Sequence, residues 1–291
     1  MACALRWDAV AGWFHVMQWN LPAFADEIHP DPAPALDTMH AAGINTVELR
    51  SAWGKNVLDL TDEELAALTQ EVARRTMTVA VIASPVGKSL ITDPAAFESA
   101  RLDRALAIAR RLGSWGVRVF SFYLPPGESP ERYRDEVLRR IEQWVHRAAE
   151  SGITLLHENE KEIYGDIPHR CFDLLNSIGS PWFRAVWDPA NFVRCGVRPF
   201  STGFTMLAPF IAHVHVKDAV LGSGEVTVAG AGDGKIAETL AALATRGYRG
   251  YLSLEPHRLI AGSHGGFTGR TAFLTALRAL RQLLDGIPVP S

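Results

Sequence analysis

Four residues that could hold a divalent metal ion stand at the ends of four successive apolar runs in the second half of this 291-residue chain. Glu158, Asp188 and Glu255 each directly follow such a run, and His215 lies near the end of another. Three carboxylates brought to one place would repel one another unless a cation neutralised them. A set of three carboxylates and one imidazole suits Mn²⁺, Mg²⁺ or Co²⁺ and tolerates Zn²⁺. The residues therefore predict a site for one divalent metal ion, with Mn²⁺ favoured and no organic cofactor.

Two histidines compete for the ligand position on the third of these runs. His213 and His215 are two residues apart, so in a strand both side chains point to the same side. His215 lies nearer the carboxyl end of the run and is predicted to be the ligand. His213 lies deeper, and we interpret it as an interior histidine or as a hydrogen-bonding partner behind the metal site.

Short apolar runs alternate with longer segments of helical periodicity along the chain. Eight of the runs are predicted to be strands: 24–28, 46–49, 78–83, 118–122, 154–157, 185–187, 211–216 and 251–254. Helices are predicted to begin at the capping box 61–64, at Asp93-Pro94, at Ser129-Pro130 and at 166–168, and a last helix is predicted over 268–284. Glycines at the expected helix ends are Gly43, Gly113, Gly152, Gly179 and Gly247.

Eight strand–helix units indicate a parallel sheet, and eight parallel strands close most economically as a (β/α)₈ barrel, the TIM barrel. The alternative is an open doubly wound sheet, which usually has a glycine-rich turn after its first strand. The segment 26–30, which follows the first run, contains no glycine. We therefore predict an α/β fold with one barrel domain over residues 23–291 and an N-terminal extension over residues 1–22. Such a barrel would bring all four candidate ligands to one mouth.

The composition limits the partners. The chain has 29 Lys and Arg against 32 Asp and Glu, so no basic excess favours nucleic acid or an anionic membrane. No apolar stretch is long enough to span a bilayer, and the first twenty residues have no secretory signal. Cys3, Cys171 and Cys195 form neither a disulfide framework nor a zinc motif. These features predict a cytoplasmic protein that acts on a small molecule, with homodimer formation left open.

At these motifs the chain resembles the sugar phosphate isomerase/epimerase family, the xylose isomerase-like TIM barrels. The segments that carry the resemblance are GITLLHEN (152–159), WDPAN (187–191), HVHVKD (213–218) and SLEPH (253–257). Members of this family hold a metal on a Glu, an Asp, a His and a Glu from the last four strands. The resemblance implies the same four ligands: Glu158, Asp188, His215 and Glu255.

The chain also departs from two branches of that family. In the ketose epimerases a substrate-contacting His follows the metal Asp by three residues and a substrate-contacting Glu follows the first metal Glu by six. These positions are Asn191 and Tyr164 here, with Glu160 nearby, and all three are predicted to contact substrate. The DNA-repair nucleases place extra metal-binding histidines on strands two and three. Those strands end without histidine here, which argues against nucleic-acid chemistry.

The reaction predicted from these features is proton transfer next to a carbonyl, through a metal-stabilised enediolate, in a sugar or a sugar-like polyol. Glu158 and Glu255 are the predicted acid/base pair, which permits isomerisation or epimerisation. Lys217 and His257 are predicted to hydrogen-bond the oxyanion or to carry a hydroxyl proton. Two alternatives stay open: a dehydratase of a keto-inositol-like substrate, and a metal-containing sugar-binding barrel without catalysis.

Other polar residues near the strand ends have two interpretations each. Glu48 and Arg50 could contact substrate or could form ion pairs beneath the metal site. Ser84 and Lys88, after the third strand, could meet a carboxylate or a phosphate. The glycine-rich loop 230–234 could present backbone N–H groups to an anion, or could serve only as a turn.

Overall fold

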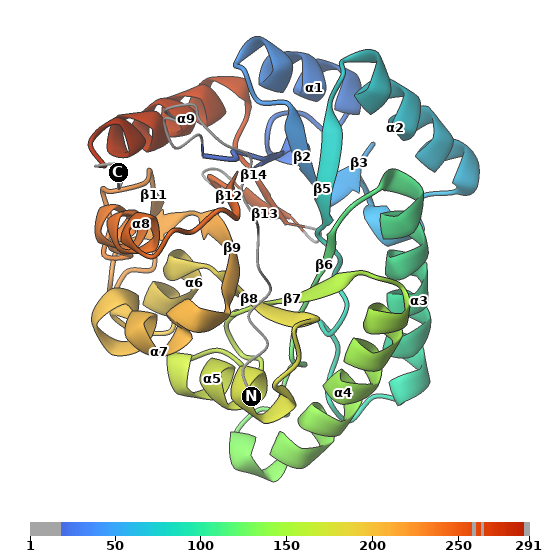
Figure 1. The fold of residues 1–291 in the computed structure, drawn as a ribbon, viewed down its shortest axis with the longest axis vertical. Coiled ribbons are helices and arrows are strands. Elements are labelled where there is room, and N and C mark those ends of the chain that lie inside the picture. The colour runs from blue at the N-terminus through green and yellow to red at the C-terminus, as the bar shows by residue number, and fades with distance from the viewer. Residues whose placement is uncertain (1–18, 258–259, 263–264, 288–291) are drawn as a thin grey trace, which may run out of the picture.

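Eight parallel strands form a closed barrel in the computed structural model, which describes residues 19–257, 260–262 and 265–287 (Figure 1). The neighbours around the barrel are β1, β12, β9, β8, β7, β6, β5 and β2, and β2 closes onto β1. The strands are β1 (Ala23–Phe24), β2 (Thr46–Leu49), β5 (Thr78–Ile82), β6 (Gly116–Val119), β7 (Thr154–Glu158), β8 (Phe183–Trp187), β9 (Ile211–Val216) and β12 (Tyr251–Leu254). The predicted TIM barrel is confirmed, and each predicted strand overlaps one barrel strand.

The first and fourth strands differ from the predicted ranges. β1 ends at Phe24 because the chain turns into a 3-10 helix, η1 (Ala25–Glu27). β6 covers Gly116–Val119 rather than 118–122. Beyond β6, Phe120 donates its backbone N–H to Val86 of the preceding loop at 2.8 Å, so this apolar segment pairs with a loop and not with the barrel.

The helices surround the barrel, as Figure 1 shows. They are α1 (Pro32–Ala41), α2 (Asp62–Arg74), α3 (Ala95–Leu112), α4 (Arg134–Glu150), α5 (Pro168–Ile178), α6 (Pro189–Arg194), α7 (Thr205–Leu207), α8 (Ile236–Thr245) and α9 (Arg270–Asp285). The capping box at Thr61 and Glu64 is present at the start of α2. Pro94 is the N-cap of α3 rather than its first helical residue. No helix in the described part of the chain is both long and apolar enough to cross a membrane.

The alternation of strand side chains stacks two layers inside the second half of the barrel. Leu156 and Val186 belong to a buried apolar cluster with Ala80 and Val81. Glu158 follows Leu156 by two residues and therefore points to the same side of the sheet, one layer nearer the mouth. The same two-residue step leads from Val186 to Asp188, from His213 to His215 and from Ser253 to Glu255. The lower layer is thus apolar beneath Glu158 and Asp188, whereas beneath His215 and Glu255 it contains His213 and Ser253.

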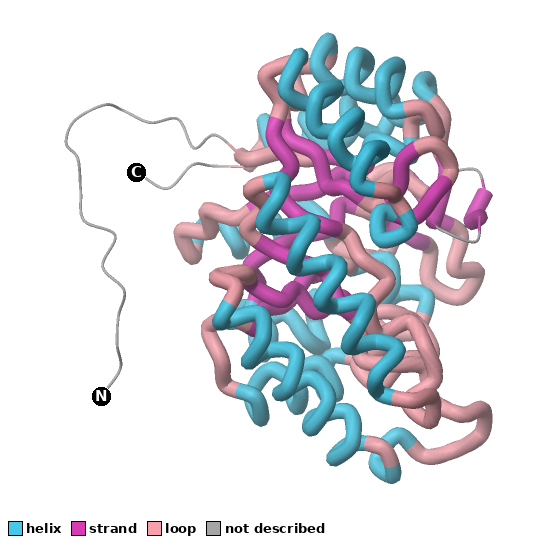
Figure 2. The backbone as a smooth tube through the Cα atoms, turned by 90° about the vertical axis from the view of Figure 1, so that its right-hand side faces the viewer, coloured by secondary structure: helices cyan, strands magenta, loops and turns pink. Residues whose placement is uncertain are grey.

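Three small two-stranded sheets follow the carboxyl ends of barrel strands. They are β3 (Ser51–Ala52) with β4 (Lys55–Asn56), β10 (Asp218–Ala219) with β11 (Val226–Thr227), and β13 (Ile260–Gly262) with β14 (Gly265–Phe267). In Figure 2 the described chain begins and ends on one side of the barrel, and the β13–β14 hairpin projects on the other. The mouth therefore lies on the hairpin side.

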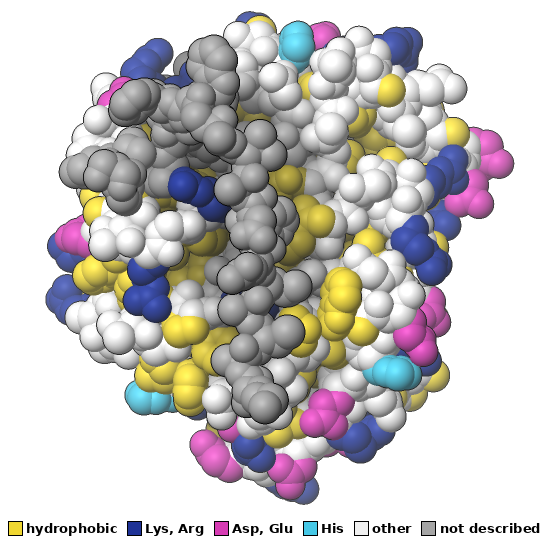
Figure 3. All heavy atoms as spheres, viewed as in Figure 1, with side chains coloured by type: hydrophobic (Ala, Val, Ile, Leu, Met, Phe, Trp, Pro, Cys, Tyr) yellow, Lys and Arg dark blue, Asp and Glu magenta, His cyan; other side chains and the backbone are white. Residues whose placement is uncertain are grey.

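The predicted N-terminal extension falls mostly outside the described residues. Within its range, Trp19 packs against the main hydrophobic core, and Asn20 forms a parallel bridge with Tyr251 at the start of β12. Figure 3 shows the face on which the described chain begins. Charged side chains lie around its rim, and hydrophobic side chains gather nearer its middle.

Gly87 permits a close approach between the loop after β5 and the segment after β6. Its φ is +86°, and an added Cβ would lie 2.1 Å from the carbonyl oxygen of Phe120. Gly54 has a similar φ of +73° but has no atom within 4 Å of an added Cβ. An alanine at position 54 would therefore cause backbone strain alone, whereas an alanine at position 87 would cause both backbone strain and steric overlap.

We predict that G87A destabilises the protein more than G54A does. Gly54→Ala should lower the free energy of unfolding by about 1 kcal/mol, from backbone strain alone. Gly87→Ala should lower it by roughly 1–3 kcal/mol more, because the backbone must also move apart. Urea unfolding of both variants measures the difference. Equal losses would show that the loop relaxes without cost.

Candidate metal centre

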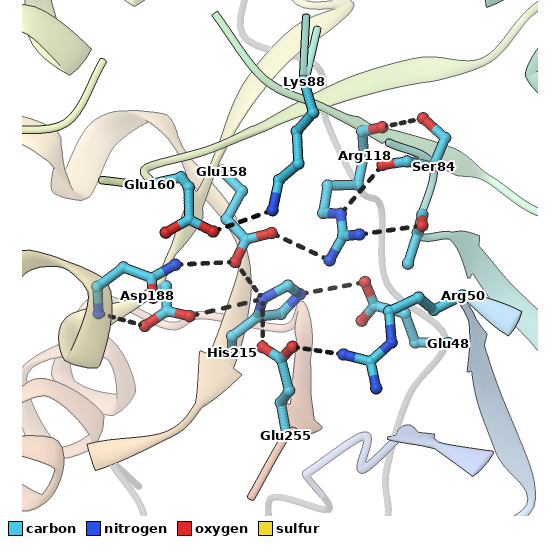
Figure 4. Close-up of polar contacts among 12 residues, drawn as sticks. Glu48, Arg50, Ser84, Lys88, Arg118, Glu158, Glu160, Asp188, His215 and Glu255 are labelled. Carbon is cyan, nitrogen blue, oxygen red and sulfur yellow. Dashed lines mark hydrogen bonds and ion pairs between the residues drawn. The ribbon is translucent and has the colours of Figure 1, made fainter. Parts of the chain in front are cut away.

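Ligand atoms of Glu158, Asp188, His215 and Glu255 converge at the mouth, all within 4.8 Å of one another (Figure 4). His215 Nδ1 lies 3.1 Å from Glu158 Oε1, 3.3 Å from Glu255 Oε2 and 3.9 Å from Asp188 Oδ2. All four residues are buried. The barrel thus brings together the four predicted ligands from β7, β8, β9 and β12.

The donor set fits a divalent cation. Glu158 Oε2 and Asp188 Oδ2 are buried and accept no well-aligned hydrogen bond from the residues that the structure describes, although Arg118 Nη1 lies 3.1 Å from the first and Lys217 Nζ lies 2.8 Å from the second. Buried carboxylates are costly to keep ionised unless positive groups compensate their charge. A metal ion bound by these oxygens and by His215 Nδ1 would add to the compensation that these two side chains supply.

The choice between the two histidines agrees with the geometry. His215 directs Nδ1 to the carboxylates, and its Nε2 lies 3.1 Å from Glu48 Oε1. A carboxylate behind a metal-binding imidazole fixes the ring and its tautomer. His213 lies one layer deeper, with Nε2 2.7 Å from Glu48 Oε2. Glu48 therefore pairs with both histidines beneath the site. This is one of its two possible roles, an interior ion pair, rather than contact with substrate.

Three buried cations surround the carboxylates. Lys217 Nζ lies 2.8 Å from Asp188 and 3.2 Å from Glu255. Arg118 Nη1 lies 3.1 Å from Glu158 Oε2. Arg50 contacts Glu255 at 3.0 Å. Each carboxylate ligand therefore has at least one cationic neighbour.

Arg50 is held by several carboxylates at once. Besides Glu255, it contacts Asp26 at 2.7 Å and Glu27 at 3.0 Å. These charges raise its pKa further, although burial alone would lower it. Arg50 lines the cavity, but its donors are directed at three carboxylates of the protein.

Burial and neighbouring charge act on the ligands in opposite directions. Burial would raise the pKa of Glu158, but the charges of His215 and Arg118 outweigh it and lower the pKa to about 2. Burial raises the pKa of Asp188 to about 6, despite the Lys217 ammonium beside it. Of these two carboxylates, Asp188 is the harder to keep ionised without a metal.

Two asparagines hold the ligands in place. Asn159 donates its amide to the backbone oxygen of Asp188 at 2.9 Å and accepts the Asp188 N–H at 3.1 Å. Asn191 donates to Glu158 Oε1 at 3.2 Å and to the Asn159 backbone oxygen at 2.9 Å. Asp188 Oδ1 in turn accepts the Asn191 N–H and caps α6. Asn159 and the WDPAN segment therefore form one hydrogen-bond network around Glu158 and Asp188.

His257 lies between two carboxylates. Its Nδ1 is 3.0 Å from Glu27 Oε1 and 3.3 Å from Glu255 Oε1, and its backbone has a positive φ of 50°. Glu27 also accepts the Thr268 hydroxyl and the His257 N–H. This network ties the end of β12 to η1.

A cavity of about 640 Å³ opens onto Glu158 and Glu255, two of the four predicted ligands. Seven of the predicted site residues line it: Arg50, Glu158, Glu160, Asn191, Lys217, Glu255 and His257. Its wall is mainly charged, and a small polar molecule could therefore reach the ligand set from solvent.

Tyr164 does not lie where substrate contact requires. Its hydroxyl donates to Asp173 of α5 at 2.7 Å, and its side chain is buried. The chain turns at Glu162, where φ is 71°, and Ile163 pairs with Tyr123. This turn directs Tyr164 toward the outer helices. The predicted substrate contact at Tyr164 is therefore not supported by its position.

The glycine-rich loop 230–234 does not present free N–H groups to an external anion. The backbone N–H groups of Gly230, Gly232 and Gly234 donate to the Asp218 carboxylate at 2.8–3.1 Å. An internal carboxylate thus occupies the position that an anion would take. Ser84 is likewise committed, since its hydroxyl donates to the Arg118 backbone oxygen at 2.6 Å.

Arg118 and Asn159 are site residues that the sequence argument did not single out. Arg118 stands between Val117 and Val119 in a buried strand, and its side chain is only 7% exposed. A charged residue inside an apolar strand was the available signal. Asn159 was quoted within a motif, but its contact with Asp188 spans two strands and has no local signature.

A profile described as the xylose isomerase-like TIM barrel matches residues 36–283, most of the chain. The chain belongs to the xylose isomerase-like TIM barrel family. This match confirms the family resemblance that the sequence motifs indicated. The same four metal ligands were predicted from that resemblance and from the strand ends.

Three relatives in this family illustrate its range. A 103-residue segment is 37% identical to the 2-epi-5-epi-valiolone 7-phosphate 2-epimerase of an Actinoplanes strain, and it covers 35% of this chain and 36% of that enzyme. The chain thus spans about a third of that relative's length. A D-tagatose 3-epimerase-like protein has a similar structure, with a TM-score of 0.74 and 17% identity over 91% of this chain and 97% of the other. A xylose isomerase-like TIM barrel protein of Mycobacterium smegmatis in complex with magnesium has a TM-score of 0.65 and 16% identity, and covers 87% and 89% of the two chains.

We predict that H215Q loses metal binding and that H213Q keeps it. His215 faces the three carboxylates, whereas His213 faces only Glu48 in this network. Titration of the purified variants with Mn²⁺, followed by electron paramagnetic resonance, should show at least a tenfold loss of affinity for H215Q. A larger loss for H213Q would reverse the assignment.

The stability of the metal-free protein should depend on Glu27 at acid pH. Burial would raise the pKa of Glu27, but the His257 hydrogen bond and the Arg50 charge lower it to about 2 from 4.5. A lowered folded-state pKa contributes stability that is complete above pH 4.5 and is lost as pH falls through 2, and the shift corresponds to roughly 3 kcal/mol.

Urea unfolding of the wild type and E27Q at pH 7 and pH 3 measures this contribution. The stability difference between them should narrow by about 2 kcal/mol at the lower pH, because only the wild type loses the ionised carboxylate. Glu162→Gln, an exposed change, is the control. Parallel pH curves for the wild type and E27Q would contradict the assignment.

Proposed function

We propose that the protein is a metal-dependent isomerase or epimerase of a sugar or a sugar-like polyol. The observation that carries this proposal is that the four-ligand group lies at the base of an open, charged cavity. A structural metal site is closed by its protein ligands, whereas a catalytic site keeps a position open to substrate. The family of the chain, which includes an epimerase relative, supports the same reaction class.

The four ligands Glu158, Asp188, His215 and Glu255 would hold one divalent ion. Oxygen-rich sets of this kind suit Mn²⁺, which we favour, as well as Mg²⁺. The bound ion would supply Lewis-acid stabilisation of the negative charge that develops on a substrate carbonyl oxygen. Fixing the ion on three buried carboxylates leaves the net charge of the site close to neutral once Lys217 is counted.

Glu158 and Glu255 are the proposed acid and base. They approach His215 Nδ1 from β7 and β12, two strands that are separated in the barrel by β8 and β9. A substrate seated above His215 would therefore have one carboxylate on each flank. One carboxylate would remove the proton next to the carbonyl and the other would return a proton, which inverts a centre or moves the carbonyl.

Lys217 and His257 are the proposed positioning and hydrogen-bonding groups. Lys217 spans Asp188 and Glu255, and His257 spans Glu27 and Glu255. Both side chains line the cavity, so each could also donate to a substrate oxygen. Glu160 and Asn191 line the same cavity and remain proposed substrate contacts.

Solvent exchange tests the reaction class. The metal-loaded protein would be incubated in D₂O with a panel of ketoses, keto-polyols and their acidic derivatives, and deuterium at the carbon next to the carbonyl would be followed by NMR. We expect exchange with at least one member of the panel. A new product of equal mass would support isomerisation or epimerisation, whereas loss of water would identify a dehydratase. No exchange across the panel would indicate a binding protein without catalysis.

We predict that E158Q and E255Q each lose exchange by at least about a hundredfold. The amide cannot take up the proton, although its oxygen can still face the metal. Glu162→Gln, at the rim of the same cavity, is the matched control and should exchange normally. Metal content must be measured for each variant. Full exchange by a metal-loaded E158Q or E255Q would contradict the assignment of that residue.

A further inference from the structure

We propose that the substrate carries an anionic oxygen group, a carboxylate or a phosphate, which binds to Lys88 and Arg118. We call these two residues the Lys88–Arg118 wall. This inference rests on the proposed function in one respect, namely that the cavity at the mouth receives the substrate. It adds the chemical class of that substrate and the part of the cavity that selects it.

Lys88 is held in a fixed place by its loop. The Gly87 N–H donates to Glu98 Oε2 at 2.9 Å, and the Phe122 N–H donates to the Gly87 oxygen at 3.0 Å. The close approach that only glycine permits at position 87 brings this loop down onto Phe120. As a result Lys88 Nζ lies 4.3 Å from the centre of the Phe120 ring.

Arg118 reaches the same ring from β6. Its Cζ lies 5.0 Å from the centre of the Phe120 ring. Its Nη2 donates to the Ala83 backbone oxygen at 3.0 Å, which fixes the guanidinium plane. Its Nη1 faces Glu158 at the edge of the cavity. Both cations therefore contact the same aromatic ring, and Figure 4 shows their side chains pointing toward Glu160 and Glu158, beside the proposed metal ligands.

The charges on this side of the cavity favour an added anion. Arg118 is paired with Glu158 at 3.1 Å and Lys88 with Glu160 at 3.0 Å. Glu158 is a proposed metal ligand, so in the loaded protein its charge is shared with a divalent ion. Because the ion, Lys217 and the three carboxylate ligands together carry a charge near zero, Arg118 and Lys88 then face one further carboxylate, Glu160. Arg101, a third cation lining the cavity, is already bound to Glu98 at 2.7 Å.

Two other buried cations at the mouth are less able to bind a ligand. Arg50 contacts three carboxylates and Lys217 contacts two, all at 3.2 Å or less. Lys88, by contrast, keeps 31% of its side chain exposed, and its partner Glu160 keeps 19%. A partly exposed pair of this kind contributes little stability, so an incoming anion can displace the carboxylate.

The geometry also places the anionic group near the reacting carbon. One oxygen of Glu158 lies 3.1 Å from His215 Nδ1, and the other lies 3.1 Å from Arg118. A single carboxylate thus spans the distance from the ligand set to the wall. An anionic group bound at Arg118 would therefore lie only a few bonds from a carbonyl bound at the ligand group.

Anion binding to the metal-loaded protein tests the wall directly. The Mg²⁺-loaded wild type would be titrated with inorganic phosphate and, separately, with acetate, and the heat of binding measured by calorimetry. Lys88→Gln should weaken binding of at least one of these anions by about tenfold, because it removes one charge-assisted hydrogen bond. The anion that shows the effect identifies phosphate or carboxylate as the preferred group.

Lys161→Gln is the matched control, since Lys161 lines the same cavity but is paired with Glu162 at the exposed rim. It should change binding less than twofold. Circular dichroism and metal content establish that both variants are folded and loaded. Equal effects of the two substitutions, or no saturable binding of either anion, would overturn the proposal.

Exchange in D₂O separates this inference from the proposed function. We expect acidic sugars to exchange faster than their neutral counterparts, and K88Q to raise KM for the acidic sugar at least tenfold with little change in kcat. Equal exchange of neutral and acidic sugars, unaffected by K88Q, would overturn the wall and leave the proposed function standing. Lys88-dependent anion binding without any exchange would support the wall and contradict the proposed function.

Discussion

The concentration of negative charge at the barrel mouth is the constraint on which the rest of the site depends. Three buried carboxylates lie around the Nδ1 atom of His215, where they would repel one another strongly in a medium of low polarity. Three buried cations offset this repulsion. They are Arg50 after β2, Arg118 on β6 and Lys217 after β9. Even so, the pKa of Asp188 is raised to about 6. This residual cost is what binding of a divalent ion would relieve.

The barrel is suited to this arrangement because of the side-chain alternation of its strands. Each of the last four strands places one residue in a lower layer and a metal ligand two residues later. Leu156 and Val186 make the lower layer apolar beneath Glu158 and Asp188, whereas His213 continues the polar network downward to Glu48. The ligands are thus fixed by backbone hydrogen bonds of the barrel. The charged groups around them come from barrel strands, as with Glu48 and Arg118, and from segments that follow strands, as with Lys217.

Glu158 connects the two halves of the proposed chemistry. One of its oxygens belongs to the ligand group, and the other pairs with Arg118 of the Lys88–Arg118 wall. Its side chain is also held by the amide of Asn191. A substrate that binds the metal through its carbonyl and the wall through an anionic group would therefore be oriented at two points. Such orientation is a large part of the rate enhancement in proton-transfer reactions.

Local patterns in the chain were sufficient to predict the eight strands, the capping box at Thr61 and the four residues that converge at the mouth. These features depend on apolar periodicity and on the position of a residue at a strand end, and both are visible within a few residues. The partners of those residues were not predictable in the same way. Arg118 meets Glu158 because β6 and β7 become neighbours, and Arg50 meets Glu255 across 205 positions of the chain because the barrel closes. The packing of the segments that follow β7 and β9 also determines that Tyr164 faces α5 and that Asp218 occupies the glycine-rich loop. Strand alternation is a short-range property, whereas the pairing of buried charges depends on which strands become neighbours in space.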